Sequence, residues 1–216
     1  MGSLVIHTEV ISHSMRTNAL LLAVAVAASG SLLAQTTSKN IVGYVNKTIP
    51  KNQFLMIANP LNNGGNTVEE VIKISSDLAL YHFVGGTFVG STALGGAWIE
   101  GNDTVVAPGG GFFAFGLDAA DVKITFVGEV AVGKVVSIPT GLSIRSSALP
   151  QAGKLDALEY PVGDETVYQF AAGGYSGSDA LGGTWLGDAP TVAVAESFWV
   201  LNNEPSKNWT RSFTIN

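Results

Sequence analysis

The chain of 216 residues aligns with itself when it is shifted by 87 positions. At this offset Ser91–Trp98 matches Ser178–Trp185, and both segments read Ser-x-Ala-Leu-Gly-Gly-x-Trp. An internal repeat of this length indicates a supersecondary unit that the fold uses twice. We therefore predict a leader over residues 1–34, a first β-rich repeat over 35–127 and a second over 128–216.

The self-match is expected to continue without a gap, which places Phe112 on Trp199. Trp209 then aligns with Val122, so it has no aromatic counterpart and is a candidate for a role specific to the second repeat. Trp98 and Trp185 align with each other. An aromatic face suits a sugar ring, but aromatics shared by both copies are expected to anchor the two cores.

Each repeat consists of short β-forming segments separated by Gly and Pro. Gly contributes 26 residues, and charged residues make up only 13% of the chain. In the first repeat strands are expected over residues 39–49, 53–58, 80–83, 87–89, 97–100, 111–115 and 122–127. One helical turn is expected at Thr67–Glu70, which has the form of a capping box. The fold class is therefore predicted to be all-β, each repeat forming a small β-sandwich or open barrel. Units of this size bury little surface alone, so the repeats are expected to pack together.

The N-terminus resembles an export signal. Met15 and Arg16 give a short basic start, the run Ala19–Ala28 is apolar, and cleavage is expected after Ala34. Translation is predicted to begin at Met15. A membrane-anchored N-terminus is the alternative, but the apolar run is short for a span. The expected location is secreted, extracellular or at the cell surface.

Composition excludes several chemistries. With no Cys in the chain, disulfides, thiolate metal sites and Cys nucleophiles are impossible. The net charge of −6, with no basic cluster, argues against nucleic-acid binding. No membrane span is expected in the mature chain. His82 is its only histidine, faces Gln169 in the repeat alignment and is expected at a strand surface. We predict no cofactor, no metal ligands and no catalytic residues, and no ligand-binding residues are assigned.

Secreted β-proteins include glycosidases, which use paired carboxylates. Glu69 and Glu70 lie on the expected helical turn, and Asp164 and Glu165 are adjacent in an expected loop. Both pairs are expected to be solvated. The loops that contain Asn102-Asp103 and Asp188 carry oxygen ligands suited to Ca²⁺, but without the regular spacing of a calcium loop.

The segments IVGYVNKTIP, FLMIANPL, LYHF, VAPGGGFFAF and ITFVGEV, with SIRSSALPQAG, TVYQF, VAVAESFWV and WTRSFTIN in the second half, resemble a group of uncharacterised secreted bacterial proteins. The likeness covers residues 40–216. The order of these segments is also similar, more distantly, to β-sandwich modules of bacterial cell-surface proteins. In the second half Ala195-Glu196-Ser197 replaces the Pro-Gly turn. The resemblance implies export and a β-fold, and no activity.

The favoured function is that of an exported, non-enzymatic protein with a structural, adhesive or cell-surface-associated role. Such a protein would associate with itself or with surface polysaccharide. The alternative is a carbohydrate-binding module for extracellular polysaccharide, and a secreted glycoside hydrolase is less favoured. The features in which the repeats differ are the remaining candidates for function: His82 against Gln169, the Pro-Gly turn against Glu196, and Trp209.

Overall fold

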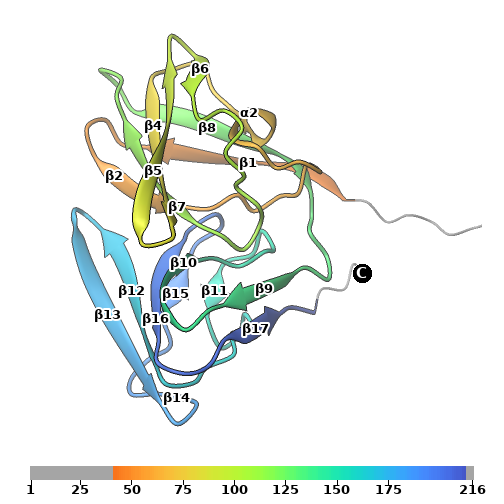
Figure 1. Ribbon diagram of the computed structural model, residues 1–216, viewed down its shortest axis with the longest axis vertical. Helices are drawn as coiled ribbons and strands as arrows, with labels where there is room; N and C mark the ends of the chain where they lie inside the picture. Colours follow the sequence, from red (N-terminus) through yellow and green to blue (C-terminus); the bar gives the residue numbers. More distant parts are fainter. Residues whose placement is uncertain (1–40, 213–216) are drawn as a thin grey trace, which may run out of the picture. The chain divides into compact units, whose positions relative to one another are not determined.

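The structure, a computed structural model, describes residues 41–212, and these are almost entirely β (Figure 1). The elements in chain order are β1 (Val42–Ile49), β2 (Phe54–Ile57), α2 (Val68–Val71), β3 (Ile72–Lys73), β4 (Leu78–Val84), β5 (Thr87–Leu94), β6 (Ala97–Glu100), β7 (Phe112–Gly116), β8 (Val122–Glu129), β9 (Val135–Ile138), β10 (Gly141–Arg145), β11 (Gly153–Lys154), β12 (Glu165–Ala171), β13 (Gly174–Leu181), β14 (Thr184–Trp185), β15 (Thr191–Val192), β16 (Phe198–Asn202) and β17 (Lys207–Thr210).

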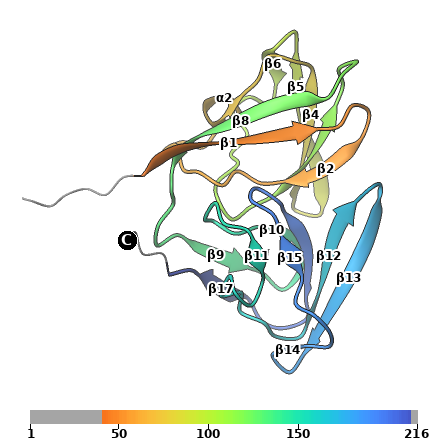
Figure 2. The same ribbon diagram turned by 180° about the vertical axis from the view of Figure 1, so that it is seen from behind.

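The N-terminal half, residues 41–129, consists of two antiparallel sheets around one core. The larger sheet has the order β2-β7-β4-β5-β6, and the smaller has the order β1-β8-β3. Strands β1 and β8 pair along their full length, as Figure 2 shows. Ile49, Leu80, Phe112 and Phe126 are among the fully or almost fully buried residues between the sheets. The capping box at Thr67 is present and begins the short helix α2.

The C-terminal half, residues 130–212, has a larger sheet of order β10-β16-β12-β13-β14. The pairs β9-β17 and β11-β15 complete this half. Its own core includes Ile138, Leu155, Val167, Phe198 and Trp209. The expectation of an all-β fold is confirmed, and none of the sheets of the described residues closes into a barrel.

The two larger sheets share one strand order, and the same turns connect their strands. Gly95 and Gly182 both adopt positive φ in a Gly-Gly turn, and their N–H groups donate to Asp77 and Asp164 at 2.6 and 2.5 Å. A left-handed conformation explains why glycine stands there. The Asp side chains fix each turn to the start of β4 or β12, because Asp77 and Asp164 directly precede these strands.

Strand register corrects the expected alignment by one residue in its later part. Tyr81 pairs with Phe113, and Tyr168 pairs with Trp199. Phe113, not Phe112, therefore occupies the position equivalent to Trp199, because the loop before β16 is one residue shorter than the loop before β7. By the same reasoning Trp209, which pairs with Val136, corresponds to Ile124 and not to Val122.

Reciprocal backbone contacts join the halves. Gly110 in the loop before β7 forms a bridge with Arg145, and Glu196 in the loop before β16 forms a bridge with Ile57. The Ala58 N–H donates to Ala195 O at 3.1 Å, and Ser146 N–H donates to Gly109 O at 3.1 Å. Each half thus extends the edge of the other half's larger sheet.

The expected leader, residues 1–34, and Phe213 lie outside the described residues. Between residues 41 and 212, no helix has the length and apolar character that a membrane crossing requires.

Candidate functional site

An aromatic groove runs where the outer faces of the two larger sheets meet. Its volume is about 320 Å³, and its lining is aromatic: Phe54, Tyr81, Phe88, Phe113, Phe170 and Tyr175. These residues come from β2, β4, β5, β7, β12 and β13, so both halves contribute. We refer to this site as the aromatic groove.

Alternation along the strands places the rings in the groove. On β4, Leu80 and His82 are buried on the face that packs on the N-terminal core, and Tyr81 and Phe83 lie on the opposite face. Successive side chains of a strand point to opposite faces. Because the opposite face meets the C-terminal sheet, both faces of β4 carry large apolar groups.

Ring-to-ring contacts hold the groove in shape. Phe113 lies at its base, 7% exposed, and contacts Phe170 edge-to-face with centroids 5.6 Å apart. At the rim Phe54 is 45% exposed, Phe88 is 52% exposed and Tyr175 is 57% exposed. Tilted and edge-to-face pairs at these distances stabilise aromatic clusters beyond simple burial. The rim rings are therefore exposed to solvent above a packed aromatic base.

A more polar cavity of about 430 Å³ adjoins the groove and shares Phe54 and Phe170 with it. Asn52 and Gln53 line it together with the turn Ala172-Gly173. The described lining of the two cavities contains side-chain amides and Tyr hydroxyls but no charged side chain. Together they can hold an uncharged ligand through stacking and hydrogen bonds.

The tryptophans singled out from the sequence are core residues, not groove residues. Trp209 is fully buried, and its Nε1 donates to Leu158 O at 2.8 Å. Trp185 is buried and donates to Asp156 at 2.7 Å. Trp98 is half-buried and packs against the N-terminal core. The core role expected for Trp98 and Trp185 is confirmed, and Trp209, the candidate for a role specific to the second repeat, is a core residue as well.

His82 is buried, so the expectation of a surface position is wrong. Its Nε2 lies 3.2 Å from Ser91 Oγ, and its ring packs 5.1 Å from that of Phe112. Burial lowers the pKa of His82 to about 4. The Ser91 hydroxyl donates to Gly101 O at 2.9 Å. In the described residues this Ser-His pair has no carboxylate partner, unlike a hydrolase triad.

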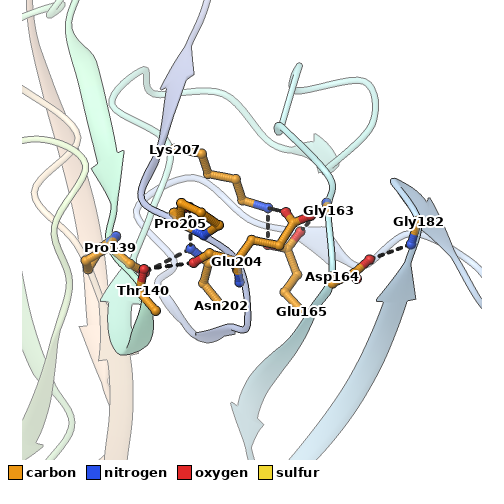
Figure 3. A network of polar contacts seen from close by, with 10 residues as sticks. All are labelled: Pro139, Thr140, Gly163, Asp164, Glu165, Gly182, Asn202, Glu204, Pro205 and Lys207. Atoms are coloured by element: carbon orange, nitrogen blue, oxygen red, sulfur yellow. Dashed lines mark hydrogen bonds and ion pairs between the residues drawn. The ribbon is translucent and has the colours of Figure 1, made fainter.

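Glu165 is also buried, contrary to the expectation of a solvated loop. It begins strand β12, its carboxylate forms an ion pair with Lys207, and its Oε1 accepts the Gly163 N–H at 3.0 Å. Figure 3 shows Lys207 reaching Glu165 from the neighbouring segment, with Glu204 beside it. This pair has a structural role.

The carboxylates of Glu69, Glu70 and Asp188 also have structural partners. Glu70 closes the capping box of α2, and Glu69 accepts the Asn102 amide at 2.9 Å. Asp188 pairs with Lys154 at 2.8 Å on the surface, and this contact lowers the pKa of Asp188. Between residues 41 and 212 no group of three or more His, Asp or Glu side chains is placed to hold a metal ion.

Comparison of the chain with models of protein families, with curated proteins and with solved structures finds no match.

The aromatic groove was not predicted from the sequence, although both halves carry the pattern Tyr-x-Phe. Tyr81 and Phe83, and Tyr168 and Phe170, repeat this pattern on β4 and β12. A strand with apolar residues on both of its faces is expected to be buried on both faces. This pattern indicates that the outer face of each larger sheet is covered, and only the fold shows that the two outer faces cover each other.

Proposed function

We propose that this chain is an exported, non-enzymatic adhesive protein that attaches to an uncharged surface polysaccharide through the aromatic groove. The observation that carries the proposal is the set of exposed rings, Phe54, Phe88 and Tyr175, fixed on a packed aromatic base. Preorganised aromatic platforms bind without a large loss of side-chain entropy.

The chemistry of the lining supports a neutral glycan as the ligand. The faces of sugar rings carry C–H groups that stack on aromatic rings. The amides of Asn52 and Gln53 supply donors and acceptors for hydroxyl groups at one end. No charged side chain in the described lining would attract an acidic polymer.

A binding assay tests the proposal. The purified chain is incubated with cellulose, chitin and starch granules, with polygalacturonate as an acidic comparator, and the bound fraction is measured. We expect retention on a neutral polysaccharide, weakened about fivefold by Tyr175→Ala, because one stacked ring contributes about 1 kcal/mol. Retention on none of the neutral polymers would overturn the proposal.

Tyr44→Ala is the matched control, because Tyr44 is 72% exposed on β1 and lies outside the groove lining. It should bind like the unmodified chain. If Tyr175→Ala and Tyr44→Ala bind equally well, the groove is not the site. Export is tested separately: N-terminal sequencing of protein from the medium of an expressing bacterium should begin at Gln35.

A further inference from the structure

A second cavity, of about 220 Å³, lies at another part of the junction between the halves. His82, Ala107, Gly110 and Arg145 are among its lining residues. In the described chain it shares no lining residue with the aromatic groove. A ligand in this cavity would therefore bind separately from the polysaccharide proposed for the aromatic groove.

The loop that borders this cavity has an equivalent in the other half. The Gly110 N–H donates to Ala107 O at 3.2 Å, and the Glu196 N–H donates to Ala193 O at 3.2 Å. Gly110 bridges to Arg145 in the same way that Glu196 bridges to Ile57. Gly110 and Glu196 are thus equivalent positions that differ in their side chains.

In the C-terminal loop the Glu196 carboxylate lies at the position that is equivalent to the cavity beside Gly110. It accepts the Ala193 N–H at 2.8 Å and the Gln169 amide at 3.0 Å. Lys47 lies close by, where it donates to Val194 O at 3.1 Å. Burial lowers the pKa of Lys47, and the charge of Glu196 partly offsets this shift. Two donors and a cation satisfy one internal carboxylate.

In the N-terminal loop the backbone donor is kept and the carboxylate is missing. Gly110 has no side chain, and the Ala107 N–H, equivalent to that of Ala193, has no acceptor in the described part of the chain. His82 stands in the place of Gln169. Arg145 replaces Ile57 and brings a positive charge to the cavity wall.

Arg145 has no counter-ion among the ion pairs of the described residues. Its Nη1 donates to Ile144 O at 2.8 Å, while its Nε is buried without a partner. Burial lowers the pKa of this guanidinium. A partly buried cation without an anion is costly, and guanidinium groups favour carboxylates.

We propose that this cavity binds a carboxylate group of a ligand, held by Arg145 and the Ala107 N–H where Glu196 supplies the carboxylate in the other half. The chemistry is shared by two sources, an acidic sugar and the C-terminus of a peptide. Both are small enough at the carboxylate end for a cavity of about 220 Å³.

Calorimetric titration of the full chain tests this site with four probes. Glucuronate and N-acetylalanine carry the carboxylate, and glucuronamide and N-acetylalaninamide are their neutral controls. We expect at least one carboxylate to bind at least tenfold more tightly than its amide. Binding of glucuronate alone indicates an acidic sugar, and binding of N-acetylalanine alone indicates a peptide end. Binding of neither overturns the proposal.

Two variants locate the binding. Arg145→Gln should weaken carboxylate binding at least tenfold. Gly110→Glu should abolish it by supplying an internal carboxylate, as Glu196 does; a Cβ at Gly110 would lie 3.5 Å from Ala107 O, an ordinary contact. Thermal unfolding verifies that Gly110→Glu is folded. Unchanged carboxylate affinity in the folded Gly110→Glu variant would overturn the assignment.

Discussion

Phe113 and Trp199 occupy equivalent positions in the two larger sheets, and their rings contact each other with centroids 6.2 Å apart. Met56 and Ile144, which are equivalent as well, belong to the same buried cluster. Equivalent residues meet in this way when two similar sheets face each other about a local two-fold relationship. The reciprocal bridges of Gly110 and Glu196 follow the same relationship.

Truncation of Trp199 should therefore destabilise the whole described unit. Trp199 is 8% exposed and contacts aromatic rings of the N-terminal half. We expect Trp199→Ala to lower the free energy of unfolding by about 3–5 kcal/mol. Phe113→Ala should cost a similar amount, and the double variant less than the sum, because the two residues touch. Urea denaturation measures all three, and a cost below about 1 kcal/mol for Trp199→Ala would contradict the interface.

Local sequence signals predicted the strands well because turns and alternation are short-range properties. The Gly-Gly turn at Gly95 and the capping box at Thr67 were both readable from the sequence. The contact between the outer sheet faces was not readable, because it depends on loops that extend the edge of the other half. The repeat alone indicated two similar units. It did not indicate which sheet faces of these units contact each other.

Burial of polar residues was the other point that the sequence did not provide. His82 and Glu165 are types that usually lie at the surface. Each has a polar partner inside the fold: His82 Nε2 lies 3.2 Å from Ser91 Oγ, which also contacts Gly101 and Thr104, and Lys207 pairs with Glu165. Single-sequence patterns carry no information on such pairs.

The Glu165–Lys207 pair stands where the N-terminal half has apolar residues. Leu78 begins β4 as Glu165 begins β12, and Val122 pairs with Ile49 as Lys207 pairs with Ile138. Lys207→Val alone should cost about 3–5 kcal/mol, because it leaves a buried carboxylate unpaired. The double variant Glu165→Leu/Lys207→Val should lie within about 1 kcal/mol of the unmodified chain.

Chemical denaturation of the single and double variants measures this coupling. Lys154→Val is the control, because Lys154 forms an exposed ion pair with Asp188. Exposed pairs contribute about 0–1 kcal/mol. A double variant as unstable as Lys207→Val would show that the apolar pair does not fit the C-terminal core.

Glu196 should stabilise the loop before β16 through its carboxylate. Glu196→Ala removes the acceptor for the Ala193 N–H and the Gln169 amide. Because Glu196 is partly exposed, water replaces part of the loss, and we expect a cost of about 1–2 kcal/mol. Amide hydrogen exchange should quicken at Ala193. Unchanged exchange there would contradict the hydrogen bond.

Acid should weaken the fold through His82. Its pKa is about 4 in the folded chain, against 6.5 when unperturbed, because burial disfavours the charged ring. Between these values the unfolded chain binds more protons, so stability falls as the pH drops from 6.5 to 4 and this effect levels off below. The full loss is about 3 kcal/mol. His82→Gln, which copies Gln169, removes this titration. Urea unfolding at about pH 7.5 and about pH 4.5 should therefore show a pH dependence smaller by about 2–3 kcal/mol in the variant; equal pH dependence in both proteins would contradict the burial of a neutral His82.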